Sequence, residues 1–284
     1  MLKKIFFAVA LLLASELGAK PVVIASIAPV EYLAKAVGGD KIEVQSLAKG
    51  DVHSYEPKPN DMKAVAKARI FIAAGLEFEE AWIPRFKASA KNLVVVKSDA
   101  KIAKLKEERG EQAEHDEKHE AHADPHVWLN PMLAITMARN ISDALIDMDK
   151  ANKDFYLENF QKLMNDLLAF DESAKNELAG LKNRKFVVYH PAWGYFAAHY
   201  DLEQISIERS GKEPKIDEMA STLKMIKDEN IKVIFADPNR SQKSAQILAS
   251  QTGAKVELLD PLGYNLLENL KIAVGAIKDA NSPK

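Results

Sequence analysis

The chain of 284 residues contains no cysteine. This absence excludes disulfide bonds, thiolate metal ligands and a lipid anchor attached through a thioether. Beyond the first residues there is also no long hydrophobic run, so no later segment is predicted to cross a membrane. Positive and negative charges nearly balance, with 39 basic and 41 acidic residues. Such a balance does not indicate a nucleic-acid partner.

The amino terminus is typical of a secretory signal peptide. Lys3 and Lys4 precede an apolar run over residues 5–14, and Leu17-Gly18-Ala19 is an acceptable cleavage site. A membrane anchor is the alternative, and the shortness of the apolar run disfavours it. We expect residues 1–19 to be removed, which takes away two lysines and one glutamate. The mature chain then carries 37 basic against 40 acidic residues, a formal charge of −3.

Most of the remaining chain alternates short β-rich runs with helical periods, which predicts parallel sheets covered by helices. The strands are expected at 21–27, 42–47, 69–73, 92–97, 185–189, 204–208, 232–236 and 255–259. The helices between them are expected at 29–37, 57–68, 79–90, 191–199, 215–229, 242–252 and 266–277.

Two features in the middle of the chain divide this pattern into halves. Residues 100–125 form a charged loop, and a helix is expected at 132–148. A second helix over 151–181 has apolar residues at three- and four-residue steps and would be roughly 46 Å long. We therefore predict an α/β protein with two parallel-sheet lobes, 20–150 and 182–284, joined by a rigid helix over 151–181.

Four residues that commonly bind metals lie in separate loops. His53, His190 and Asp260 follow predicted strands, and His126 lies in the loop that enters the helix at 132–148. Ligand sites of parallel sheets lie beyond the carboxyl ends of the strands, so all four can point into a cleft between the lobes. Three imidazoles with a carboxylate suit a borderline-soft dication such as Zn²⁺. Asp124 could orient the His126 ring through a hydrogen bond.

Each candidate also has a purely structural interpretation. His53 could be an exposed loop residue, His126 and His190 could be hydrogen-bonded turn residues, and Asp260 before a proline could initiate a turn. His115, His119 and His122 form H-x3-H-x2-H, which fits a weak metal-gathering tract and a solvated linker equally well. His199, within a predicted helix, is interpreted as structural.

Several motifs together resemble the zinc- and manganese-binding receptors of bacterial ABC importers, and most of all their periplasmic zinc receptors. The similarity extends over essentially the whole mature chain. The motifs are HSYEPKPND from His53, AGLEFEEAW from Ala74, DPHVWLNP from Asp124, YHPAWGYF from Tyr189, GKEP from Gly211 and LDPLG from Leu259.

The resemblance implies a periplasmic, monomeric solute-binding protein that delivers Zn²⁺ to an inner-membrane ABC permease and is not an enzyme. Members of this family tend to carry histidine at the position of His190 for zinc and glutamate for manganese, in line with the softness of each metal. Two departures stand out. The His-rich loop at 115–122 is short, and the disulfide that many zinc receptors carry in the second lobe cannot form.

We therefore expect His53, His126 and His190 to bind zinc, with Asp260 or water as the fourth ligand. Affinity should fall below about pH 6.5, where free imidazole is protonated. The long helix should limit lobe motion. A manganese or broad-range receptor is the alternative. An exported zinc hydrolase is disfavoured because no H-E-x-x-H helix is present, and an adhesin because nothing extends beyond the two lobes.

Overall fold

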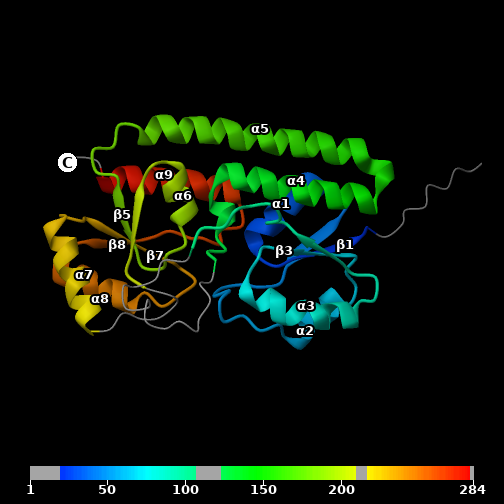
Figure 1. The fold of residues 1–284 in the computed structure, drawn as a ribbon, viewed down its shortest axis with the longest axis horizontal. Coiled ribbons are helices and arrows are strands. Elements are labelled where there is room, and N and C mark those ends of the chain that lie inside the picture. The colour runs from blue at the N-terminus through cyan, green and yellow to red at the C-terminus, as the bar shows by residue number, and fades with distance from the viewer. Residues whose placement is uncertain (1–19, 107–122, 209–215, 282–284) are drawn as a thin grey trace, which may run out of the picture.

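The computed structural model describes residues 20–106, 123–208 and 216–281, and it arranges them as two α/β lobes along one long helix (Figure 1). The first lobe contains β1 (Val22–Ala25), α1 (Ala28–Gly38), β2 (Glu43–Ser46), α2 (Pro59–Val65), β3 (Ile70–Ala73), α3 (Glu77–Ser89), β4 (Val94–Lys97), η2 (Val127–Leu129) and α4 (Pro131–Met148). The second contains β5 (Lys185–Val188), α6 (Gly194–His199), β6 (Glu203–Ser206), α7 (Ile216–Asp228), β7 (Val233–Ala236), α8 (Lys243–Thr252), β8 (Lys255–Leu258) and α9 (Leu266–Asn281). Between them lie η3 (Lys150–Asn152) and α5 (Lys153–Leu178).

The two sheets have the same topology. Their strand orders are β2-β1-β3-β4 and β6-β5-β7-β8, and every neighbouring pair is parallel. In each sheet the chain starts at an inner strand, adds one neighbour on one side and then crosses to the other side. The predicted fold class, two parallel-sheet α/β lobes joined by a long helix, is confirmed.

Side chains alternate cleanly between the two faces of each sheet, as strand geometry requires. In β1, Val23 packs into one core and Ile24 into another. In β7, Val233 and Phe235 pack on one face while Ile234 packs on the opposite face. The core that includes Val23 and Phe235 is continuous through both lobes and includes α1, α4, α5 and α9. The lobes therefore share a core on the side of the long helix and have separate cores on the other side.

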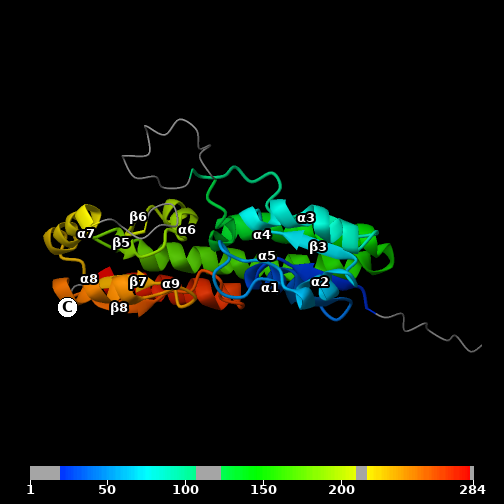
Figure 2. The ribbon, with the colours of Figure 1, turned by 90° about the horizontal axis from the view of Figure 1, so that it is seen from below.

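The long helix is shorter than predicted. Residues Lys150–Asn152 form a 3₁₀ turn, and α5 itself has 26 residues, which corresponds to roughly 39 Å. It lies over α4 and α9 and reaches across both lobes (Figures 1 and 2). Its buried face follows the predicted period, with Phe160, Leu163 and Leu167 in the shared core.

Helix α6 begins later than the predicted helix at 191–199. Residues 191–193 form an irregular turn after β5, where the Ala192 amide donates to the His190 carbonyl at 2.8 Å. This turn places His190 at the carboxyl end of the sheet instead of at a helix start.

None of the helices in the described ranges is long and apolar enough to cross a membrane. The predicted signal segment 1–19 and the histidines at 115, 119 and 122 lie outside the described residues. The described ends of the charged loop meet in an antiparallel bridge between Lys106 and Ala123.

Candidate metal centre

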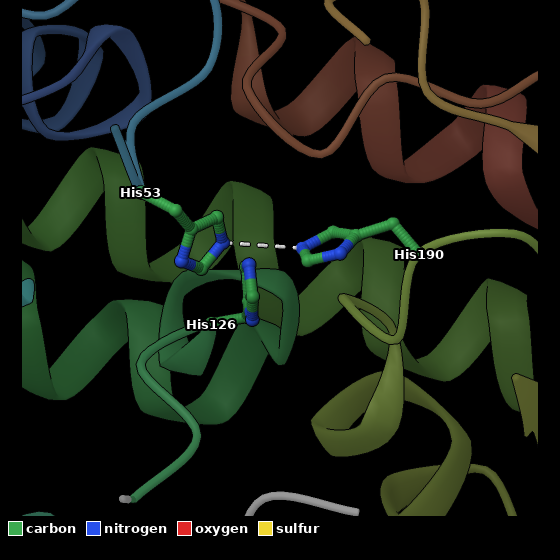
Figure 3. Close-up of side chains that lie close together, drawn as sticks. All are labelled: His53, His126 and His190. Atoms are coloured by element: carbon green, nitrogen blue, oxygen red, sulfur yellow. Dashed lines mark hydrogen bonds between the residues drawn. The ribbon is translucent and has the colours of Figure 1, made fainter. Parts of the chain in front are cut away.

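Three of the four predicted ligands come together between the lobes. His53, His126 and His190 each offer one ring nitrogen, and these three atoms all lie within 4.8 Å of one another. Nε2 of His53 and Nε2 of His190 are 3.2 Å apart, and the three rings face a common point (Figure 3). Tetrahedral zinc bound to imidazoles at about 2.0–2.1 Å places the nitrogens roughly 3.3 Å apart. The His53–His190 pair is already at that spacing, and the set of three lies within 4.8 Å.

The loops that carry these side chains leave the carboxyl edges of the two sheets. His53 lies between β2 and α2, His126 immediately precedes η2, and His190 follows β5. The site therefore belongs to both lobes, with two ligands from the first and one from the second. It occupies the position that parallel sheets offer to ligands.

His126 is buried, with 4% of its surface exposed, and its ring is held by a carboxylate. Asp124 Oδ1 lies 2.7 Å from His126 Nδ1 and also accepts from the His126 backbone amide at 2.9 Å. The contact leaves Nε2 for a metal and confirms the orienting role predicted for Asp124. Asn130 caps the following helix by accepting from the amides of Met132 and Leu133, which fixes the end of this turn.

The His126 loop is also attached to the second lobe. Trp128 Nε1 donates to the Pro261 carbonyl at 2.8 Å, and the Tyr195 hydroxyl donates to the Asp124 carbonyl at 2.8 Å. Trp128 and Tyr195 are both buried. Hydrogen bonds across the lobe boundary thus fix the backbone that presents His126.

His190 is 6% exposed and has a carboxylate partner of its own. Glu208 Oε2 lies 3.1 Å from His190 Nδ1, so Nε2 again faces the centre of the cluster. Glu208 is 2% exposed, and its other oxygen accepts from Arg240 Nη2 at 2.6 Å. The Arg240 charge compensates the buried carboxylate.

His53 has a different environment, because it is the exposed member of the cluster. Its backbone amide donates to Asp51 Oδ1 at 3.1 Å, and Ser54 Oγ donates to Asp51 Oδ2 at the same distance. Asp51 therefore fixes the turn that carries His53. The hydrogen-bond contact of the ring itself is with His190.

The cluster is prepared for a cation because two of its imidazoles, those of His53 and His190, have lowered pKa values. Desolvation of the His53 ring within the cleft, followed by the neighbouring His126 and Arg240 charges, lowers its pKa to about 4. Burial, followed by the charges of His126 and Arg240, also holds the pKa of His190 well below its ordinary value. Neutral imidazoles present the lone pairs that a metal requires.

Asp260 is not a member of the three-histidine cluster. Its Oδ1 accepts from Asn239 Nδ2 at 2.8 Å and from the Leu262 amide at 2.9 Å. These contacts are those of a turn residue, which was the structural interpretation of this position. The carboxylate lies in the loop beside the site, and its role as a ligand stays a prediction.

His199 lies away from the cluster and has a structural contact. Its Nε2 is 2.6 Å from Asp171 Oδ1, which joins α6 to the long helix α5. Sequence reasoning missed Glu208 and Arg240, which support His190 from neighbouring strand ends. It also missed Asp237, a buried carboxyl group whose pKa is raised by burial and which lines the small cavity beside the three histidines.

Comparison with known proteins gives a consistent result over the whole described chain. The family model described as "Zinc-uptake complex component A periplasmic" (ZnuA) matches residues 23–280. The "High-affinity zinc uptake system protein ZnuA" of Bacillus subtilis is 30% identical over 288 residues, covering 94% of this chain and 89% of that protein.

Two solved structures have the same fold. A crystal structure of ZnuA is 35% identical with a TM-score of 0.85, covering 93% of this chain and all of the other. The laminin-binding protein Lmb of Streptococcus agalactiae, described as bifunctional with adhesin and metal-transporting activity, is 27% identical with a TM-score of 0.80 over 93% of this chain and 100% of that one. The fold alone therefore does not separate metal receptors from adhesins.

Proposed function

The chain belongs to the family of periplasmic zinc-uptake components, and from that premise we propose that it captures Zn²⁺ between its lobes and delivers it to an inner-membrane ABC permease. Members of this family are binding proteins of transport systems. We propose the same here: a periplasmic, monomeric receptor of residues 20–284 without catalytic activity.

The observation that carries the proposal is the cluster of His53, His126 and His190. Two buried imidazoles oriented by carboxylates and a third at the cleft edge form a donor set of three nitrogens. Nitrogen ligands favour zinc, whereas manganese prefers oxygen ligands. The family relatives named for zinc uptake support the same metal.

We propose that Asp260 or a water molecule occupies the fourth zinc position. Water is favoured because Asp260 is not a member of the three-histidine cluster and its Oδ1 already accepts two hydrogen bonds. A carboxylate ligand would instead require the Asp260 side chain to move towards the three imidazoles. Zinc readily accepts either ligand in a tetrahedral shell.

A broad-range or manganese receptor is the alternative within the same class. It would need an oxygen-rich site, and the described cluster supplies only nitrogens. A zinc hydrolase would also use three histidines and water. However, the carboxylates closest to the rings, Asp124 and Glu208, are already engaged with Nδ1 atoms and are not positioned to activate water.

Uptake of radioactive zinc by cells lacking this protein tests the proposal. We expect the wild-type protein to restore high-affinity uptake and His190→Ala to fail when both are exported in equal amounts. Restoration by His190→Ala, or no restoration by the wild type, would contradict a role in zinc delivery.

A further inference from the structure

Arg240 lies at the junction of the two lobes and approaches both loops that carry the metal ligands. It follows β7, and its side chain is 17% exposed. Nη2 donates to Glu208 Oε1 of the second lobe at 2.6 Å, and Nη1 lies 3.7 Å from Asp51 Oδ1 of the first lobe. The three histidines, Asp51 and Arg240 line the same small cavity.

The two contacts of this guanidinium group are unequal. The Glu208 contact is a short, charge-assisted hydrogen bond in a buried position. The Asp51 contact at 3.7 Å is too long for a hydrogen bond, and Nη1 is buried without a hydrogen-bond partner among the described residues. An approach of roughly 0.8 Å by Asp51 would complete the missing bond.

Asp51 cannot make this approach without moving His53. Its two carboxylate oxygens accept from the His53 amide and the Ser54 hydroxyl, so the turn moves as a unit. At the other end, Glu208 contacts both Arg240 and the His190 ring. A continuous chain of contacts therefore runs from His53 through Asp51, Arg240 and Glu208 to His190, on the side away from the metal-binding nitrogens.

We propose that Arg240 is a positioning residue that closes the His53 loop over bound zinc. The inference rests on the proposed zinc-binding function. The His53 and His126 ring centroids are 5.7 Å apart, farther than the 5.0 Å between His53 and His190. When zinc draws His53 towards His126, Asp51 approaches Nη1 and completes the hydrogen bond. Because this bond forms in the closed site and is shielded from solvent, it slows zinc release and has little effect on zinc capture.

Stopped-flow measurement of zinc release to an excess of chelator tests this coupling in the mature chain. The variants are Asp51→Asn, Arg240→Gln and the double variant. Asn at position 51 keeps a side-chain oxygen for the His53 amide, removes the charge and replaces the oxygen that accepts from Ser54 with an amide NH2. We expect each single change to accelerate release about tenfold, with association unchanged, and the double variant to release no faster than either single variant.

Arg240→Gln leaves Glu208 as an uncompensated buried carboxylate and could impair folding. Asp51→Asn therefore carries the test by itself, and Arg240→Lys should restore part of the slow release because it keeps the charge. Glu229→Gln is the matched control. It removes the 2.9 Å ion pair with Lys185 within the second lobe and should leave release unchanged.

A spectrum of the bound metal distinguishes a change in the position of the His53 loop from the loss of a metal ligand. In the cobalt-substituted protein, Asp51→Asn should leave the visible absorption of the bound metal unchanged while release becomes faster. Release of zinc from Asp51→Asn at the wild-type rate, or multiplicative effects in the double variant, would overturn the inference. A wild-type protein that fails to bind zinc would instead overturn the proposed function.

Discussion

The two buried histidines and the exposed histidine of the cluster are held in different ways. His126 and His190 are 4% and 6% exposed, and each has a carboxylate on Nδ1. His53 is exposed, and its carboxylate neighbour Asp51 holds the backbone instead of the ring. The His126 loop is hydrogen-bonded across the lobe boundary, whereas the corresponding charged contact of the His53 loop is the 3.7 Å approach of Asp51 to Arg240.

This difference indicates that the two buried histidines and the exposed histidine have different roles in one site. The buried pair is oriented before metal arrives, so little free energy is spent on ordering those rings. The exposed imidazole can admit a hydrated ion and then complete its coordination. Because both lobes and α5 share a core, we expect closure to involve the His53 loop more than a rotation of whole lobes.

The largest loss of zinc affinity should come from replacing one of the two buried histidines. We expect His190→Ala to lose most of the zinc affinity, because it removes a pre-oriented ligand and leaves Glu208 facing a cavity. Competition with a chelator of known affinity measures the loss. Unchanged affinity would show that the cluster is not the zinc site.

A smaller loss should follow from His53→Ala. Two oriented imidazoles remain, and water can take the vacated position. Thermal unfolding of the zinc-free protein sharpens the contrast, because removal of the exposed ring should change the free energy of unfolding by no more than about 0.5 kcal/mol. Equal destabilisation by His53→Ala and His190→Ala would contradict the distinction between the exposed histidine and the buried histidines.

The carboxylate behind His126 should matter less than the ligand itself. We expect Asp124→Ala to weaken zinc binding roughly 10- to 100-fold, because the His126 ring loses the partner that fixes its orientation. Asp171→Ala is the matched control, since Asp171 makes a similar 2.6 Å contact with His199 away from the site. Zinc affinities that fall equally in both variants would point to a general loss of structure.

The smallest expected effect is the change in zinc affinity at mildly acidic pH. With the pKa of His53 lowered to about 4 and that of His190 also well below 6.5, these two rings stay neutral when free imidazole would be protonated. Protonation of these two rings should therefore cost little zinc affinity from pH 7.5 to about 5.5 and should weaken binding as pH approaches 4, lower than the sequence alone indicated. Titrations across this range check the shape of the curve. A fall of about a hundredfold or more per unit starting at pH 6.5 would show that His53 or His190 titrates as free imidazole does.

The sequence predicted the fold and the close approach of the three histidines, because both depend on local patterns. Alternating strands and helices place strand ends at one edge of each sheet, so the loops of His53 and His190 could be assigned to a common cleft. The parts that could not be predicted depend on register and on contacts between lobes. Glu208 reaches His190 because β6 pairs with β5, and Arg240 meets Asp51 across the lobe boundary.

Asp260 illustrates a limit of a different kind. An aspartate before a proline after a strand fits both a ligand and a turn, and the residue type does not distinguish the two. The hydrogen bonds from Asn239 and Leu262 are those of the turn. The sequence placed the loop correctly but could not give the direction of its side chain.

Titration of the metal-stripped chain from Lys20 onward with zinc, against a competing chelator and with or without excess manganese, tests the central claim most directly. A three-nitrogen site predicts one tight zinc equivalent per chain that manganese does not displace. Weak zinc binding, or ready exchange of zinc for manganese, would contradict a zinc receptor built on these three histidines.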